Sequence, residues 1–203
     1  MISQNVKDLY YVLMYPCSRL LKPLYRLHYR LINNDRSKVH LGCGTSYLTG
    51  FVNIDGNFRR RVDYALDIRV GLPFPDDSIE FIYSCHMMEH LHIWEAIDLL
   101  RECRRVLSRT GYMRLTLPDF GYVRKLLSGE EVCEFPRRFR SKEGQAINHL
   151  FCDGQHKYAF SEEVIRELAS EIGFSNVVTA PLCDSKLPDQ AEPGGSFSVN
   201  LFK

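Results

Sequence analysis

The sequence predicts an α/β fold with a mostly parallel sheet, an antiparallel last strand and a helical segment in front of the sheet. Short apolar segments alternate with helical segments and turns from Lys38 onward, which is typical of parallel sheets. Glycines or an aspartate directly follow the first three of these segments. A Pro/Gly-rich stretch without a helix joins the last two segments, whereas parallel neighbours would need a crossover connection.

The expected elements follow one another without an internal repeat. The strands are expected at residues 39–41, 51–54, 64–66, 79–84, 112–117, 176–179 and 197–202. Helices are expected at residues 93–107, 121–127 and 161–173, the last between a serine cap and a terminal glycine. Apart from the second of these helices, residues 119–160 are polar and are expected to be irregular.

The composition excludes several functional classes. The formal net charge of the 203 residues is +1, so nothing points to nucleic acid as a partner. The seven cysteines include no C-x-x-C pair, and we expect reduced thiols in a cytoplasmic protein rather than a metal site. No apolar run is long enough to span a membrane, and the N-terminus lacks the pattern of a signal peptide.

Three strand ends carry residues suited to an adenosine-containing ligand. Gly42 and Gly44 follow the first strand, where glycines let the backbone approach a ligand closely, although a plain strand-to-turn pair is the alternative. Asp55 ends the second strand, where a carboxylate can accept both ribose hydroxyls. Asp67 ends the third strand and could hold the exocyclic amine of adenine. For both aspartates, the alternative is a solvated turn residue.

Five segments in this order resemble the class I S-adenosylmethionine-dependent methyltransferases, whose sheet is Rossmann-like. They are VHLGCG, VNIDG, ALDI, LPFPDDSIEFIYSCHMMEHL and RECRRVLSRTGYMRLTLPD, within residues 38–120. Residues 156–203 resemble the family more loosely, as a helix followed by two strands. The pattern is most similar to the small predicted methyltransferases of polysaccharide biosynthesis clusters. This resemblance implies an enzyme that uses S-adenosyl-L-methionine as its cofactor.

The resemblance also implies roles for individual residues. The turn after the first strand would bind the methionine part of the cofactor, the second strand end the ribose, and the third the adenine. The implied cofactor-binding residues are Leu41, Gly42, Cys43, Gly44, Asp55, Gly56, Asp67, Ile68, Ser84 and Cys85. His40 departs from the pattern, because the family commonly has an acid there that supports the methionine end.

Three histidines are candidate catalytic bases. An acceptor hydroxyl must lose a proton on methylation, and histidine titrates near neutral pH. His86 follows the fourth strand, whereas His149 and His156 lie in the segment 119–160, which the resemblance makes an insertion over the acceptor pocket. For His86, packing under the following helix is an equal alternative.

Further candidates for acceptor binding lie in the same insertion. Asp119 directly follows the fifth strand and is either an acceptor contact or a helix cap. Arg137 and Arg138 suit a phosphate on the acceptor, with an ordinary solvated loop as the alternative. We therefore expect O-methylation of a saccharide or glycolipid. The alternatives are methylation of a small lipophilic acceptor and a non-catalytic binding module that keeps the fold.

Residues 1–35 form a separate N-terminal helical segment in front of the methyltransferase domain at 36–203. Apolar residues recur there at helical spacing, and Pro16 and Pro23 are expected to divide or kink the helix. One interpretation is a helix pair that caps the methyl-donor site or packs on the second subunit of a homodimer. The other is an amphipathic anchor at residues 1–32 on the inner face of a membrane, because apolar residues alternate with arginine and lysine.

Overall fold

The computed structural model describes residues 4–32, 36–58, 60–131, 139–181, 187 and 195–203. These residues form a seven-stranded sheet in the order β3-β2-β1-β4-β5-β7-β6. The strands are β1 Lys38–Leu41, β2 Val52–Asp55, β3 Tyr64–Ala65, β4 Ile79–Cys85, β5 Leu107–Pro118, β6 Asn176–Ala180 and β7 Ser196–Phe202. The first five strands run parallel, and β7 lies antiparallel between β5 and β6. The predicted fold class, including the antiparallel last strand, is therefore confirmed.

The strand order changes direction at β1, which lies between β2 and β4. In open parallel sheets, ligands bind at such a switch point, beyond the carboxyl ends of the strands. β1 ends at Leu41, β2 at Asp55 and β4 at Cys85. The topology therefore gathers the predicted cofactor residues at one edge of the sheet.

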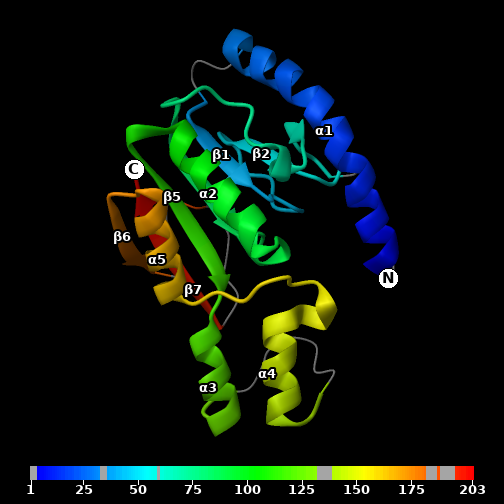
Figure 1. Cartoon of the computed structure of the whole chain (residues 1–203), viewed down its shortest axis with the longest axis vertical. Helices are drawn as coiled ribbons and strands as arrows, with labels where there is room; N and C mark the ends of the chain where they lie inside the picture. The colour runs from blue at the N-terminus through cyan, green and yellow to red at the C-terminus, as the bar shows by residue number, and fades with distance from the viewer. Residues whose placement is uncertain (1–3, 33–35, 59, 132–138, 182–186, 188–194) are drawn as a thin grey trace.

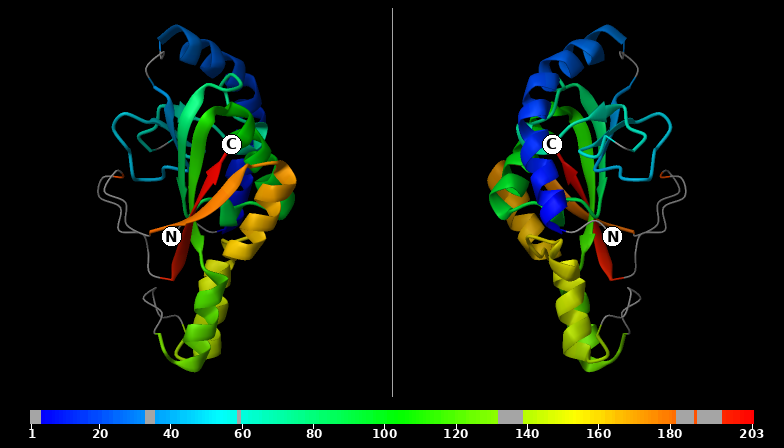
Figure 2. Two further views of the ribbon diagram at one scale, coloured as in Figure 1. Left: turned by 90° about the vertical axis from the view of Figure 1, so that its left-hand side faces the viewer. Right: turned by 90° about the vertical axis from the view of Figure 1, so that its right-hand side faces the viewer.

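Helices cover one face of the sheet, and a loop covers part of the other. The helices are α1 Gln4–Ile32, α2 Ile93–Val106, α3 Phe120–Ser128, α4 Lys142–Phe151 and α5 Glu162–Ile172, with the short turns η1 Ile68–Val70, η2 Met88–His90 and η3 Cys152–Gly154. Figure 2 shows α2 and α5 on the same side. On the opposite face, Leu48 and Phe51 from the connection between β1 and β2 pack on Tyr83. That connection is too short for a full crossover helix.

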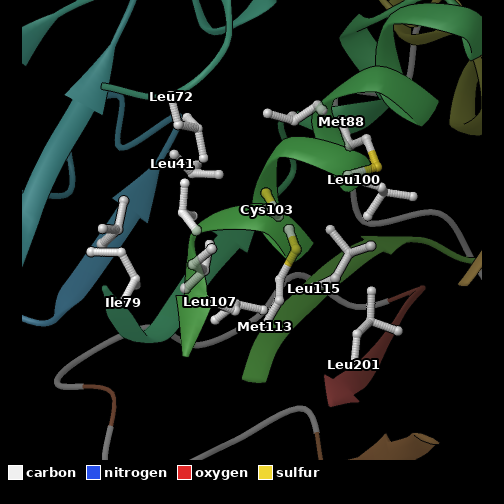
Figure 3. Packing of buried hydrophobic residues seen from close by; sticks show 14 of the residues in the cluster. Leu41, Leu72, Ile79, Met88, Leu100, Cys103, Leu107, Met113, Leu115 and Leu201 are labelled. Carbon is white, nitrogen blue, oxygen red and sulfur yellow. The ribbon is translucent and has the colours of Figure 1, made fainter. Parts of the chain in front are cut away.

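The main core lies between α2 and the sheet. Apolar residues of α2 recur at helical spacing and are buried. They pack against buried residues of the strands, as Figure 3 shows for Leu41, Ile79, Met113, Leu115 and Leu201. Complete burial of one such side chain contributes about 1.5–3 kcal/mol. This packing fixes the strands whose carboxyl ends carry the site.

The N-terminal segment is one continuous helix, so Pro16 and Pro23 do not divide it, and of the two expectations only a kink remains. Both prolines are exposed. Each removes one backbone hydrogen bond from the helix, and packing against the domain on either side offsets this cost. Tyr10 bonds to the loop after β2, and the Tyr25 ring stacks on Tyr64 of β3 at 4.6 Å between centroids. Figure 1 shows α1 along this side of the molecule. None of the helices in the described ranges is long and apolar enough to cross a membrane.

The expectation that residues 119–160 are mostly irregular is also wrong. α3 and α4 pack side by side beyond the end of β5 (Figure 2). We expected α3 but not α4, because Gly144 lowers the helix propensity inside α4 and only Ala146 and His149 are buried along it. β5 also begins earlier than predicted, since Leu107 already pairs with the start of β4 before a register shift.

Candidate active site

Gly42 and Gly44 turn the chain sharply after the buried Leu41 at the end of β1. Their φ angles are 65° and 52°, in the left-handed region that favours glycine. The N–H of Gly42 donates to the carbonyl of Ile54 at 2.8 Å, which ties the turn to β2. A Cβ at Gly42 would overlap the side chain of Met87, whereas a Cβ at Gly44 would meet no atom within 4 Å. Bare backbone therefore borders open space at the switch point.

Asp55 lies directly against this turn. Its Oδ2 accepts a hydrogen bond from the N–H of Gly44 at 2.9 Å, and its Oδ1 accepts one from the N–H of Asn57 at 2.7 Å. Each carboxylate oxygen offers a further lone pair, so the side chain can still accept hydroxyl donors. The fold thus brings Gly44 and Asp55 into contact, and their arrangement fits the ribose and methionine parts of S-adenosylmethionine.

Asp67 has a different environment from Asp55. It is buried, and Arg69 binds both of its oxygens, Nε to Oδ1 at 2.9 Å and Nη2 to Oδ2 at 2.6 Å. Its Oδ1 also caps η1 by accepting from the N–H of Arg69. The next residue, Ile68, is half-buried and packs against the main core. Arg69 already binds the Asp67 carboxylate. The contact between Asp67 and adenine therefore stays a prediction.

Gly56 is in contact with α1. The Tyr10 hydroxyl donates to the carbonyl of Gly56 at 2.6 Å, and a Cβ on Gly56 would lie 3.0 Å from the ring of Tyr11. Arg69 donates through Nη2 to the carbonyl of Tyr11 at 3.2 Å. Burial, and then the charge of Asp55, raise the pKa of Tyr11. The N-terminal helix therefore borders the predicted ribose end of the cofactor site.

The remaining residues near the strand ends are two cysteines, a serine and a histidine. Burial raises the pKa of Cys43 to about 12, so this residue stays a thiol. Ser84 is buried, and within the described ranges its hydroxyl has no hydrogen-bond partner, whereas Cys85 is half-buried. His40 is buried with Nδ1 3.3 Å from Oδ1 of Asn53, and burial lowers its pKa to about 4. His40 is therefore neutral at pH 7 and carries no charge toward the methionine end.

His86 stands at the end of β4 with a φ of 50°, unusual for a residue other than glycine. Its N–H donates to the carbonyl of Thr116 in β5 at 3.1 Å. On the imidazole, Nδ1 lies 3.3 Å from Oε1 of Glu89, and Nε2 lies 2.9 Å from the hydroxyl of Ser196. A carboxylate on one ring nitrogen favours the proton there, which leaves the other nitrogen basic. The geometry thus suits a base.

Glu89 is buried between several histidines. Its side chain is 1% exposed, and neither carboxylate oxygen has a hydrogen-bond partner among the residues that the structure describes. Nε2 of His156 lies 3.9 Å from Oε1 of Glu89, and Nδ1 of His156 contacts the carbonyl of Leu150 at 2.8 Å. His90 places Nδ1 3.2 Å from the carbonyl of Gln155. Burial lowers the pKa of His156.

His149 and Asp119 are joined through the backbone. Nε2 of His149 lies 3.1 Å from the carbonyl of Asp119, and its ring packs on Tyr122. Burial lowers the pKa of His149, which keeps it neutral. The Asp119 carboxylate accepts from the N–H of Gly121 at 2.8 Å and caps α3. These contacts favour the alternative interpretation of Asp119 as a helix cap.

The fold brings some predicted residues together and adds others. His86 and His156 both face Glu89, whose carboxylate we had not predicted as the centre of the cluster. Ser196 carried no local signal in the sequence, because it meets His86 across 110 residues of chain. Arg137 and Arg138 lie outside the described residues.

Comparisons with known proteins agree with this fold. Residues 53–115 match a family model described as a methyltransferase domain. No curated protein sequence matches the chain. Among solved structures, an S-adenosylmethionine-dependent methyltransferase from Archaeoglobus fulgidus is 14% identical with a TM-score of 0.54, covering 96% of this chain and 100% of that one. A second one, from Mesorhizobium loti, is 14% identical with a TM-score of 0.53, and the match covers 90% of this chain and 98% of that one. A methyltransferase from Thermotoga maritima, named as a possible histamine N-methyltransferase, is 16% identical with a TM-score of 0.51. That match covers 97% of this chain and 94% of the other.

These structures share the fold, at identities too low to carry a substrate across. The methyltransferase-domain match spans β2 to most of β5, and thus Asp55, Asp67 and His86. The turn at Gly44 adjoins this segment and is hydrogen-bonded to Asp55. The methyltransferase-domain match over residues 53–115, on this fold, supports an S-adenosylmethionine-dependent methyltransferase with S-adenosylmethionine as its cofactor.

Proposed function

We propose that this methyltransferase acts on a hydroxyl group of a saccharide or glycolipid. The observation that supports O-methylation is the position of His86 between Glu89 and Ser196, at the end of β4. When bound, S-adenosylmethionine supplies an activated methyl group on a sulfonium. The protein then has two tasks, to align the acceptor with the methyl group and to remove the acceptor's proton.

His86 would carry out the second task. Oε1 of Glu89 lies 3.3 Å from Nδ1 of His86 and favours the proton there, which would leave Nε2 free to take a proton. Ser196 is the present hydroxyl partner of Nε2. An acceptor hydroxyl in the place of the Ser196 hydroxyl would give its proton to Nε2 while its oxygen bonds to the methyl carbon. The sulfonium would supply the methyl group and keep the electron pair on sulfur, and His86 would end protonated next to the negative charge of Glu89.

The first task falls to the carboxyl ends of β1 and β2. Gly42 and Gly44 would bind the methionine part with their backbone. Asp55 would accept hydrogen bonds from the ribose hydroxyls. Tyr10 and Tyr11 of α1 border the same place through Gly56, so the N-terminal helix would cap the bound cofactor.

A glycolipid acceptor agrees with the exposed face of α1. Seven leucine and isoleucine side chains on this helix are more than half exposed: Leu9, Leu13, Leu20, Leu24, Leu27, Leu31 and Ile32. Such a helix can lie in the surface of a membrane, at its inner face in this proposal, and bring the site to a lipid-linked acceptor. The saccharide itself rests on the resemblance to the polysaccharide-cluster methyltransferases. The same exposed face would also serve a small lipophilic acceptor, the second candidate.

One assay tests the reaction. The full chain is incubated with methyl-labelled S-adenosylmethionine and with lipid and saccharide extracts, and the labelled product is identified. We expect label on a sugar oxygen. His86→Asn, which tolerates a positive φ, should lower the turnover by about 10²–10⁴-fold without changing cofactor affinity. The control is His92→Asn, because His92 is an exposed histidine that directly precedes α2. Label on a nitrogen, or on a lipid without sugar, would contradict the proposal, as would full activity of His86→Asn.

A further inference from the structure

Glu89, His90 and His156 form a cluster that the methyl-transfer reaction does not use as a whole. The ligand atoms of these three side chains lie within 4.8 Å of one another. Glu89 and His90 come from η2, directly after β4, and His156 comes from the segment after η3. The sequence did not suggest this cluster, because its two parts are more than sixty residues apart and contain no cysteine pair. We propose that the cluster binds a divalent transition-metal ion, such as Zn²⁺.

The two histidines are oriented as metal ligands are. A ligating histidine usually gives its other ring N–H to a backbone carbonyl, which fixes the tautomer and the direction of the ring. His90 places Nδ1 3.2 Å from the carbonyl of Gln155, and His156 places Nδ1 2.8 Å from the carbonyl of Leu150. Both carbonyls therefore hold the proton on Nδ1. The free Nε2 of His156 faces the Glu89 carboxylate.

Glu89 supplies the negative charge that a metal ion needs. Its carboxylate is 1% exposed, and neither oxygen has a hydrogen-bond partner within the described ranges. A buried carboxylate without hydrogen bonds is costly, and a metal ion would compensate it. The same carboxylate lies 3.3 Å from Nδ1 of His86, but its two oxygens offer about four lone pairs, so it can face His86 and a metal ion together.

Two histidines and one carboxylate suit zinc and related first-row ions. Their bonds to nitrogen and oxygen are about 2.0–2.2 Å long, which places neighbouring ligand atoms about 3–3.5 Å apart. From separations of up to 4.8 Å, the ligand atoms have to approach one another by up to about 1.3–1.8 Å, which rotation of the exposed His90 side chain can supply. Three protein ligands leave at least one position for water or another oxygen ligand.

The ion would join two parts of the protein that already touch. The N–H groups of Lys157 and Tyr158 both point to the carbonyl of Glu89, at 2.7 Å and 3.3 Å. A metal ion between Glu89, His90 and His156 would strengthen this link between the end of β4 and the segment that returns from the α3–α4 hairpin. The position of that hairpin beside the acceptor would then depend on the metal.

Metal binding can be measured without the methyl-transfer reaction. The full chain, stripped with a chelator, is titrated with Zn²⁺ by calorimetry and with Co²⁺ by visible absorption. We expect one ion per chain and a cobalt spectrum without thiolate charge transfer. His90→Ala and His156→Ala should each weaken Zn²⁺ binding by at least about tenfold. Zn²⁺ should also raise the melting temperature of the wild type more than that of His90→Ala.

His92→Ala is the matched control, because His92 is exposed, lies two residues from His90 and does not belong to the cluster. It should bind Zn²⁺ as the wild type does. His90 is also exposed, so its replacement should leave the fold intact, which circular dichroism checks. Absence of Zn²⁺ and Co²⁺ binding at millimolar concentrations would overturn the proposal. So would equal binding by His90→Ala and the wild type, or a thiolate signal in the cobalt spectrum.

Discussion

Two aspartates at the ends of neighbouring strands have different surroundings. Asp55 and Asp67 follow short apolar strands, and their local sequence patterns are alike. In the structure, Asp55 accepts two backbone N–H groups and borders the open space at Gly44, whereas the Asp67 carboxylate is bound by the Arg69 guanidinium. The partner of each carboxylate depends on side-chain directions that strand periodicity does not determine.

At the scale of residues, Asp55 should contribute strongly to cofactor binding. Asp55→Asn keeps the shape and one acceptor oxygen but removes the charge. Hydrogen bonds to a charged group are worth about 1.5–3 kcal/mol, so affinity for S-adenosylmethionine should fall at least about tenfold by calorimetry. Asp98→Asn, which changes an exposed acid on α2 that pairs with Arg101, should have no effect. Wild-type affinity in Asp55→Asn would exclude the predicted ribose contact.

At the scale of elements, α1 has two apolar sides. Tyr10, Ser18, Tyr25 and Tyr29 face the domain, where they bond or pack. The opposite side carries exposed leucines from Leu9 to Leu31, at spacings of three, four or seven residues. Arg19, Arg26 and Arg30 of the same helix are also exposed, and exposed apolar residues together with basic ones are typical of a helix that lies on an anionic membrane.

The exposed stripe of α1 makes a specific prediction. Replacing Leu20, Leu24 and Leu31, which are 77%, 60% and 74% exposed, by glutamine should abolish sedimentation with anionic phospholipid vesicles. The fold should persist, because these side chains face away from the domain. Leu127→Gln, an exposed leucine on α3, is the control. If the wild type does not sediment but elutes as a dimer that the triple variant loses, the stripe is a subunit interface instead.

At the scale of the whole molecule, buried histidines connect global stability to pH. Burial lowers the pKa of His40 from 6.5 to about 4, so the folded protein takes up this proton later than the unfolded chain does. Its contribution is constant above pH 6.5. As the pH falls from 6.5 toward 4, proton uptake favours the unfolded state, and the free energy of unfolding decreases by up to about 3 kcal/mol.

Urea unfolding at several pH values measures this effect. His40→Gln removes the titrating group, so its free energy of unfolding should depend less on pH between 6.5 and 4 than that of the wild type. Part of the dependence should remain, because burial also lowers the pKa values of His149 and His156. An identical pH dependence in both proteins would show that His40 does not titrate in this way.

The sequence by itself determined the sheet and which residues of the predicted cofactor site lie at its edge. Strand periodicity, the glycines at 42 and 44 and the acid at 55 are local patterns, and parallel topology carries their strand ends to one edge. The sequence predicts two helices less well. Packing on the domain keeps α1 continuous through its prolines, and α4 buries few side chains, so neither leaves a clear pattern in the sequence.

Only the tertiary structure decided which residues lie next to His86 and Glu89. Ser196 reaches His86 because β7 lies next to β5, and His156 reaches Glu89 because the α3–α4 hairpin returns the chain to the end of β4. Those contacts depend on how distant segments pack, and burial in the packed structure lowers the pKa of His156. Periodicity along the chain carries no information about such neighbours.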